Sequence, residues 1–164
     1  MKFSIKYYSL LVLSLIQFLT SCSVSKEVRK RNRDIRGNWV LQTVVTEGTS
    51  GKPKDKIFNE AEFGCFIGSE WKFERGGKGN YMIVDKQQSC PQITRNIKWS
   101  ISHPKGGQAT IALIRLDEKN MAMDNNVASN LIITQLDDQT MKWRSDLMVN
   151  GQTASIFFNF MKSH

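Results

Sequence analysis

Short segments in which apolar and polar residues alternate make up most of the chain from Gly37 to the end. Such alternation is typical of strands that bury one face, and residues that favour turns separate each segment from the next. The pattern shows no helix long enough for a crossover between them, so sequential hairpins are expected. We predict eight strands, at residues 37–46, 69–74, 81–84, 93–102, 109–116, 127–136, 141–147 and 153–160.

Two turns support this order of strands. Asn150-Gly151 is typical of a two-residue type I′ turn, and the glycine-rich segment Arg75–Asn80 predicts another hairpin. Eight sequential antiparallel strands close into an up-and-down barrel whose interior holds side chains or one small ligand. We therefore predict an all-β, eight-stranded antiparallel barrel over residues 37–164.

The alternation also predicts which side chains face the interior of the barrel. In the strand at residues 93–102, only Arg95 interrupts an otherwise apolar face. The apolar residues between Ile57 and Ile67 show no period of two, so we expect a helical turn or a loop lid held by Cys65 there. The first strand places four residues on one face: Trp39, Leu41, Thr43 and Val45.

The start of the chain has the pattern of an export signal. Lys2 and Lys6 precede an apolar run at residues 7–18. This run is too short for a membrane-spanning helix, which needs about 20 residues. The next four residues, Leu19-Thr20-Ser21-Cys22, resemble the lipobox of bacterial lipoproteins. That resemblance implies that residues 1–21 are a signal peptide and that Cys22 carries acyl chains such as palmitate. An ordinary cleaved signal peptide is the alternative.

The net charge of +8 raises the question of nucleic-acid binding. Six of the 23 basic residues lie between Ser23 and Arg36, whereas 15 basic and 13 acidic residues follow from Gly37 onward. The domain itself is nearly neutral, so we expect no nucleic-acid partner. Residues 22–36 hold few apolar side chains, and we predict a solvated tether whose charges also contact anionic lipid head groups.

Two cysteines, Cys65 and Cys90, remain once Cys22 is acylated. An exported protein folds in an oxidising compartment, where such a pair usually forms a disulfide. In the chain-entropy model, closing a loop of this length stabilises the fold by roughly 3 kcal/mol. A metal site is the alternative, although no histidine lies near either cysteine in the sequence.

The segment Gly37-Asn38-Trp39 resembles the Gly-x-Trp opening of the lipocalins. Residues 65–73, Cys90 and residues 97–101 look more specifically like the lipocalin-like domains of bacterial lipoproteins. The resemblance implies that Trp39 plugs one end of the barrel, that Gly37 lets the chain bend beneath it, and that Cys65 and Cys90 pair. The Thr-Asp-Tyr motif of the larger lipocalins is absent, and no arginine follows the last strand to stack on Trp39.

Residues for catalysis or metal binding are sparse. His103 precedes a proline in a turn and His164 ends the chain, so we expect both to face solvent. Asp137-Asp138 is typical of a turn rather than of a catalytic carboxylate pair. The acidic stretch from Asp117 to Asp124 lacks the spacing of a calcium loop, which leaves calcium as a minor alternative. We expect no enzyme, no cofactor and no metal.

The residues that point to a ligand are aromatic side chains at inward positions, with a few polar groups that would orient the bound molecule. We predict a lipid-anchored, lipocalin-like protein that binds a small apolar ligand, a lipid or acyl chain, at the outer membrane. A filled barrel that contacts an envelope protein and has no ligand is the alternative. The candidate ligand-binding residues are Trp71, Phe73, Tyr81, Arg95, Trp99, Trp143 and Phe158, with Arg115 as a further orienting group.

Overall fold

The computed structural model describes residues 25–48, 56–84, 89–149 and 151–163. The predicted signal peptide, Cys22 and Asn150 lie outside this part of the chain. The helices are α2 (Lys26–Asp34) and α3 (Phe63–Phe66), and the 3-10 turns are η2 (Arg75–Gly77) and η3 (Asp124–Asn126). The strands are β1 (Gly37–Glu47), β2 (Lys56–Ile57), β3 (Ala61–Glu62), β4 (Glu70–Phe73), β5 (Lys78–Ile83), β6 (Ile93–Ser102), β7 (Thr110–Leu116), β8 (Ser129–Leu136), β9 (Thr140–Val149) and β10 (Gln152–Ser163).

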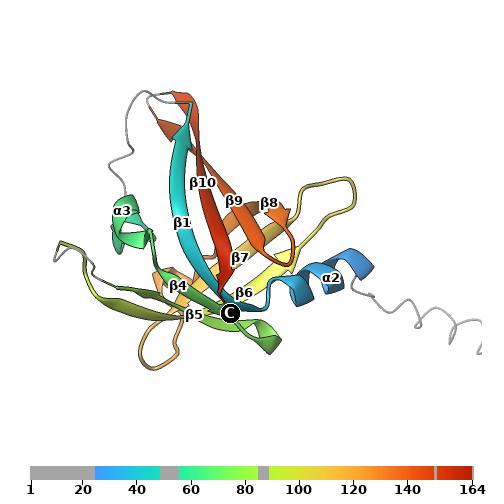
Figure 1. Ribbon diagram of the computed structural model, residues 1–164, viewed down its shortest axis with the longest axis horizontal. Helices are drawn as coiled ribbons and strands as arrows, with labels where there is room; N and C mark the ends of the chain where they lie inside the picture. Colours follow the sequence, from blue (N-terminus) through green and yellow to red (C-terminus); the bar gives the residue numbers. More distant parts are fainter. Residues whose placement is uncertain (1–24, 49–55, 85–88, 150, 164) are drawn as a thin grey trace, which may run out of the picture.

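Eight of these strands form a closed barrel in the order β1-β10-β9-β8-β7-β6-β5-β4 (Figure 1). Each strand pairs antiparallel with its neighbours, and β1 pairs with both β10 and β4 to close the sheet. The two short strands β2 and β3 form a separate hairpin within the β1–β4 connection. The predicted all-β, eight-stranded up-and-down barrel is confirmed.

The register gives the barrel two different ends. Gly37 of β1 pairs with Phe73 of β4, and Asn38 pairs with Ser163 of β10. The β4–β5, β6–β7 and β8–β9 turns lie at this end, which we call the closed end. The other four connections lie at the opposite end, which we call the mouth. In Figure 1, α2 lies beside the closed end, and β1 and β10 rise from it toward the mouth.

Trp39 lies fully buried at the closed end. Its indole N–H donates to the carbonyl of Ile35 at 2.7 Å, so the buried polar atom is satisfied. The ammonium of Lys162 lies 5.0 Å from the centre of the indole ring, within the range of a cation–π contact. A lysine at the end of β10 thus provides the cation that, by family resemblance, an arginine would provide.

The basic segment before the barrel, which we predict to be a solvated tether, folds into the helix α2. Ser25 caps α2 by accepting a hydrogen bond from the Val28 N–H. No residue of α2 is buried, but Ile35 directly after it is fully buried. The helix contacts β6, and Glu27 lies 2.8 Å from Nδ1 of His103, whose side chain is only 20% exposed. His103 is therefore more enclosed than we expected.

A β-bulge in β1 changes the face that we predicted for the second half of the strand. The register to β10 shifts between Leu41 and Thr43, and one extra residue reverses which side chains point inward. Val44 consequently packs against the core, whereas Val45 is 43% exposed. Trp39 and Leu41, before the bulge, are buried as predicted.

Aromatic rings and aliphatic side chains together fill the interior of the barrel. Trp71 lies next to Tyr81 at 4.6 Å between ring centres, and Trp143 lies 4.4 Å from Phe160. Edge-on contacts at 5.6–6.0 Å join Trp143 to Trp71 and to Phe73. Such pairs add about 0.5–1.5 kcal/mol beyond the burial of their area. Aromatic packing thus occupies the space that a larger barrel would leave for a ligand.

The predicted disulfide between Cys65 and Cys90 is present, with the two Cα atoms 5.4 Å apart. It joins α3 to the connection between β5 and β6, and both segments lie at the mouth. Within the described ranges, no helix combines the length and the apolar character needed to cross a membrane.

We predict that Trp39→Ala lowers the free energy of unfolding by about 3–5 kcal/mol, because it empties a fully buried site. Lys162→Met keeps most of the cover over the ring but removes the cation and its hydrogen bond to the Asp34 carbonyl, so its cost should be about 1–2 kcal/mol. Urea denaturation, followed by the fluorescence of the three other tryptophans, measures both variants. Equal effects of the two variants would contradict a plug role for Trp39.

Candidate functional site

A hairpin that we call the lid hairpin, residues 56–62, lies over the mouth. Its turn is closed by the Glu60 N–H, which donates to the carbonyl of Ile57 at 3.0 Å. Phe58 and Asn59 have φ angles of 53° and 56°, a left-handed conformation that asparagine tolerates but phenylalanine rarely adopts. A bulky residue there costs about 1–3 kcal/mol and persists only when its surroundings hold it. The surroundings of Phe58 are therefore informative.

Phe58 points its ring toward the barrel interior. The ring stacks over Tyr81 with 6.0 Å between centres, and it also meets Phe66 at 5.9 Å and Trp71 at 6.3 Å. These contacts place an apolar group from the lid hairpin directly above the aromatic core. They compensate for the unfavourable backbone conformation of Phe58.

Glu60 brings a buried carboxylate into the mouth, where its side chain is only 6% exposed. Arg95 Nε donates to Oε1 of Glu60 at 2.7 Å, and Arg115 Nη1 lies 3.0 Å from the same oxygen. The hydroxyl of Tyr81 donates to the other oxygen, Oε2. Arg115 also pairs with Asp124 of η3. We call these five residues the mouth network.

This geometry shifts the pKa of two members of the mouth network, Tyr81 and Arg115. Burial and the adjacent carboxylate of Glu60 raise the pKa of Tyr81 far above its ordinary value of 10.0. Burial opposes the charge of Arg115, but the hydrogen bond to Asp124 and the charge of Glu60 outweigh it and raise the pKa of Arg115. The network therefore combines two guanidinium groups, two carboxylates and a neutral phenol, and its charges balance.

A cavity of about 550 Å³ opens beside the lid hairpin. Its apolar wall comes from the inward faces of β8, β9 and β10, and the lid hairpin contributes Phe58. Arg115 and Asp124 of the mouth network are among its polar lining residues. The full lining is Lys56, Ile57, Phe58, Asn59, Phe63, Arg115, Asp124, Val127, Ser129, Asn130, Leu131, Ser145, Leu147, Ile156 and Phe158.

Comparison with known proteins agrees with this architecture. The family model described as "Lipocalin-like domain" matches residues 35–143. The chain belongs to the lipocalin-like domain family. One similar solved structure, apocrustacyanin C2, shares 17% identity with a TM-score of 0.45, over 85% of this chain and 64% of that one. The chain thus spans less than two thirds of that structure. None of the curated proteins matches the sequence.

Within this lipocalin-like domain, the predicted ligand-binding residues fall into three groups. Phe158 lines the cavity. Tyr81 and Arg95 belong to the mouth network, one layer below the lid hairpin. The other four, deeper in the barrel, pack in the aromatic core: Trp71, Phe73, Trp99 and Trp143.

The sequence analysis missed two acidic members of the mouth network, Glu60 and Asp124. Arg95 carried the clearest signal, because a charged residue on an apolar strand face needs a buried partner. Asp124 binds Arg115, and Asp117 accepts backbone N–H groups of its own loop. The part of the chain that the structure describes holds no cluster of acidic, histidine or cysteine side chains suited to a metal. The calcium alternative therefore gains no support from Asp124.

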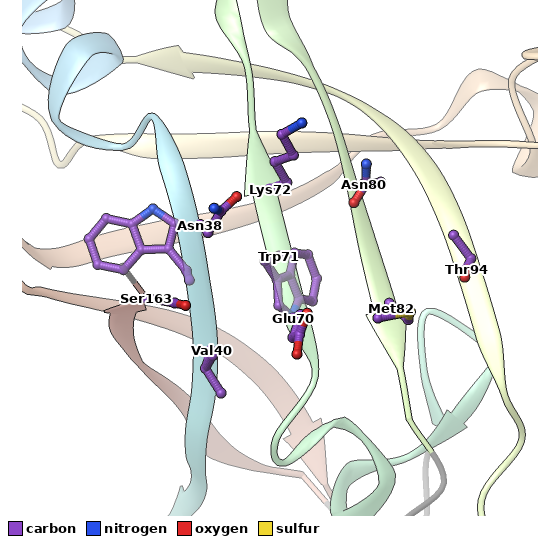
Figure 2. A pocket seen from close by; sticks show the side chains of 10 residues that line it. Asn38, Val40, Glu70, Trp71, Lys72, Asn80, Met82, Thr94 and Ser163 are labelled. Atoms are coloured by element: carbon purple, nitrogen blue, oxygen red, sulfur yellow. The ribbon is translucent and has the colours of Figure 1, made fainter.

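Two further hollows lie outside the barrel. A groove of about 310 Å³ crosses the outer faces of β1, β4 and β5 (Figure 2), where Asn38, Lys72 and Asn80 form one row across the strands. The second row contains Val40, Glu70, Met82 and Thr94. The other hollow, about 750 Å³, borders the disulfide and the residues next to it. Neither contains a buried charged group comparable to Glu60.

The raised pKa of Tyr81 predicts how the residue titrates. Tyr81 is the only tyrosine beyond residue 21, so in a Tyr7→Phe, Tyr8→Phe chain the near-ultraviolet absorbance of tyrosinate reports on it alone. The folded state favours the neutral phenol, so the stability that it contributes is complete below pH 10.0 and falls as the pH rises further. We expect tyrosinate to appear only on alkaline unfolding. Reversible ionisation of the folded protein near pH 10.0 would contradict the buried site.

Proposed function

We propose that this lipocalin-like protein binds a small apolar molecule in the cavity beside the lid hairpin. The observation that carries the proposal is the cavity itself, which measures about 550 Å³ and is lined by apolar side chains together with several polar ones. Ligand sites typically measure about 300–1,000 Å³, with mostly apolar lining and a few polar groups that orient the ligand. The charged groups that could orient a ligand here include Arg115 and Asp124 of the mouth network.

The packing of the core limits where that ligand lies. Trp71, Tyr81 and Trp143 fill the centre of the barrel, so an apolar molecule would occupy the mouth rather than the closed end. Burial against Leu131, Ile156 and their neighbours would supply most of the affinity, at about 25 cal/mol per Å² of apolar surface. A cavity of this size favours a binding role over the alternative of a fully filled barrel.

We also propose that the protein is a lipoprotein, held at the cell envelope by acyl chains on Cys22 and sorted to the outer membrane. The lipobox-like segment before Cys22 supports the anchor. The basic residues of α2 follow closely in the sequence and lie at the closed end of the barrel. Basic side chains near an anionic surface each contribute about 1 kcal/mol of attraction. In this arrangement the mouth faces away from the membrane.

A substitution that fills the cavity tests the binding site. Ser145 lines it from β9, and Ser145→Phe should weaken binding of the neutral probe N-phenyl-1-naphthylamine by about tenfold or more, because the ring occupies ligand volume. Ser100→Phe places the same ring on the exposed face of β6 and serves as the control. Fluorescence titration measures both affinities. Unaltered binding by Ser145→Phe, or equal loss in both variants, would refute the proposed site.

The anchor is tested by Cys22→Ser in cells that process bacterial lipoproteins. We expect the wild-type chain in the membrane fraction, with a mass increased by acyl chains, and the variant in the soluble fraction, because its hydroxyl cannot form the thioether. Ser23→Ala leaves the cysteine intact and should fractionate like the wild type. The same distribution for Cys22→Ser and wild type would show that Cys22 does not anchor the protein.

A further inference from the structure

We propose that Tyr81, Arg95 and Arg115 form a carboxylate-binding site. Glu60 of the lid hairpin occupies this site in the structure. The ligand is an amphiphilic carboxylic acid whose carboxylate replaces that of Glu60. The inference rests on the proposed function and deepens it, since it names the chemical class of the ligand. The lid hairpin then acts as an internal competitor of that ligand.

The three donors of this site belong to the wall of the barrel. Tyr81, Arg95 and Arg115 lie on the neighbouring strands β5, β6 and β7, and their side chains point inward. Together they bind both oxygens of one carboxylate: the guanidinium groups share Oε1, and the phenol donates to Oε2. Charge-assisted hydrogen bonds of this kind recognise a carboxylate group whichever molecule carries it.

The charge balance of the site depends on the lid hairpin. With Glu60 in place, two guanidinium groups face the carboxylates of Glu60 and Asp124. Without Glu60, Arg95 would lose its ion pair and Arg115 would keep only the one with Asp124 among the described residues. A buried cation without its counter-charge is strongly unfavourable. Opening of the lid hairpin alone is therefore disfavoured. A ligand carboxylate that enters as Glu60 leaves restores the balance.

The lid hairpin, like the proposed ligand, places an apolar group beside its carboxylate. Two residues before the carboxylate, it inserts the ring of Phe58 above Tyr81 and Trp71. A carboxylate joined to an apolar group therefore fills both positions, as an acyl chain with a carboxylate head would. The left-handed backbone of Phe58 favours release, because a hairpin that leaves the mouth relaxes this conformation.

The cavity connects the two parts of this site. Arg115 and Phe58 both line it, so a molecule bound against Leu131, Ile156 and Phe158 lies beside a guanidinium of the network. A ligand can therefore place its apolar tail in the cavity and its carboxylate at Arg115 without any opening of the barrel wall. Replacement of Glu60 then brings the head group within reach of Arg95 and Tyr81.

The test compares dodecanoate with its methyl ester, which has the same acyl chain but no charge, in displacing N-phenyl-1-naphthylamine from the full chain. We expect dodecanoate to bind about tenfold more tightly than the ester, the difference that a single charge-assisted hydrogen bond gives. Glu60→Gln removes the competing charge and leaves the site net positive. It should tighten dodecanoate binding by roughly tenfold and change the ester by less than about threefold.

Two further variants make the outcome decisive. Glu62→Gln removes an exposed carboxylate from the same hairpin and should leave both affinities unchanged. Tyr81→Phe keeps the ring and removes one donor, and it should weaken dodecanoate alone by about threefold to tenfold. Circular dichroism shows whether each variant folds. If Glu60→Gln does not fold, Tyr81→Phe still tests the carboxylate site.

The outcomes separate the two proposals. If the probe binds and both dodecanoate and its ester displace it equally well, the carboxylate site is wrong, but the proposed function still holds. Tighter binding of the acid that is insensitive to both Glu60→Gln and Tyr81→Phe also overturns it, because the head group then lies elsewhere. A probe that does not bind refutes the proposed function itself.

Discussion

Closure of the sheet through β1 is the constraint on which the rest of the structure depends. Because β1 pairs with β10 on one side and with β4 on the other, the ends of the meander meet and no barrel strand is left as a free edge. A barrel of eight strands has an interior only wide enough for side chains or one small ligand. Here rings fill it, so the chemistry of the protein lies at the mouth.

Burial of charge at the mouth is unusual for a barrel whose interior is otherwise apolar. Removing a carboxylate and two guanidinium groups from water costs several kcal/mol per ion, and their attraction compensates only when the geometry satisfies nearly every donor and acceptor. Replacing such a group by packed apolar residues is often neutral or stabilising. The mouth network is thus difficult to explain by stability alone. The proposed carboxylate ligand, which uses the same donors, would give the network a role.

The barrel itself could be predicted from the sequence because the alternation of side chains and the turn glycines depend only on local order. The bulge in β1 could not be predicted, since Thr43 and Val45 suit a strand equally well in either register. Glu60 was missed for a different reason. A carboxylate in a turn usually faces solvent, and only the tertiary fold places it beside Arg95. The unexplained arginine was visible in the sequence, but its partner was not.

The disulfide limits which part of the mouth can move. Cys65 lies in α3, directly after the lid hairpin, and its bond to Cys90 holds α3 against the β5–β6 connection. Phe66, in the same helix, is fully buried and contacts Tyr81 at 5.7 Å between ring centres. The segment that follows the lid hairpin is therefore fixed twice, once covalently and once by packing. Exchange of Glu60 for a ligand requires movement of residues 56–62 relative to an α3 that stays in place, and the bridge keeps the displaced hairpin close to the site.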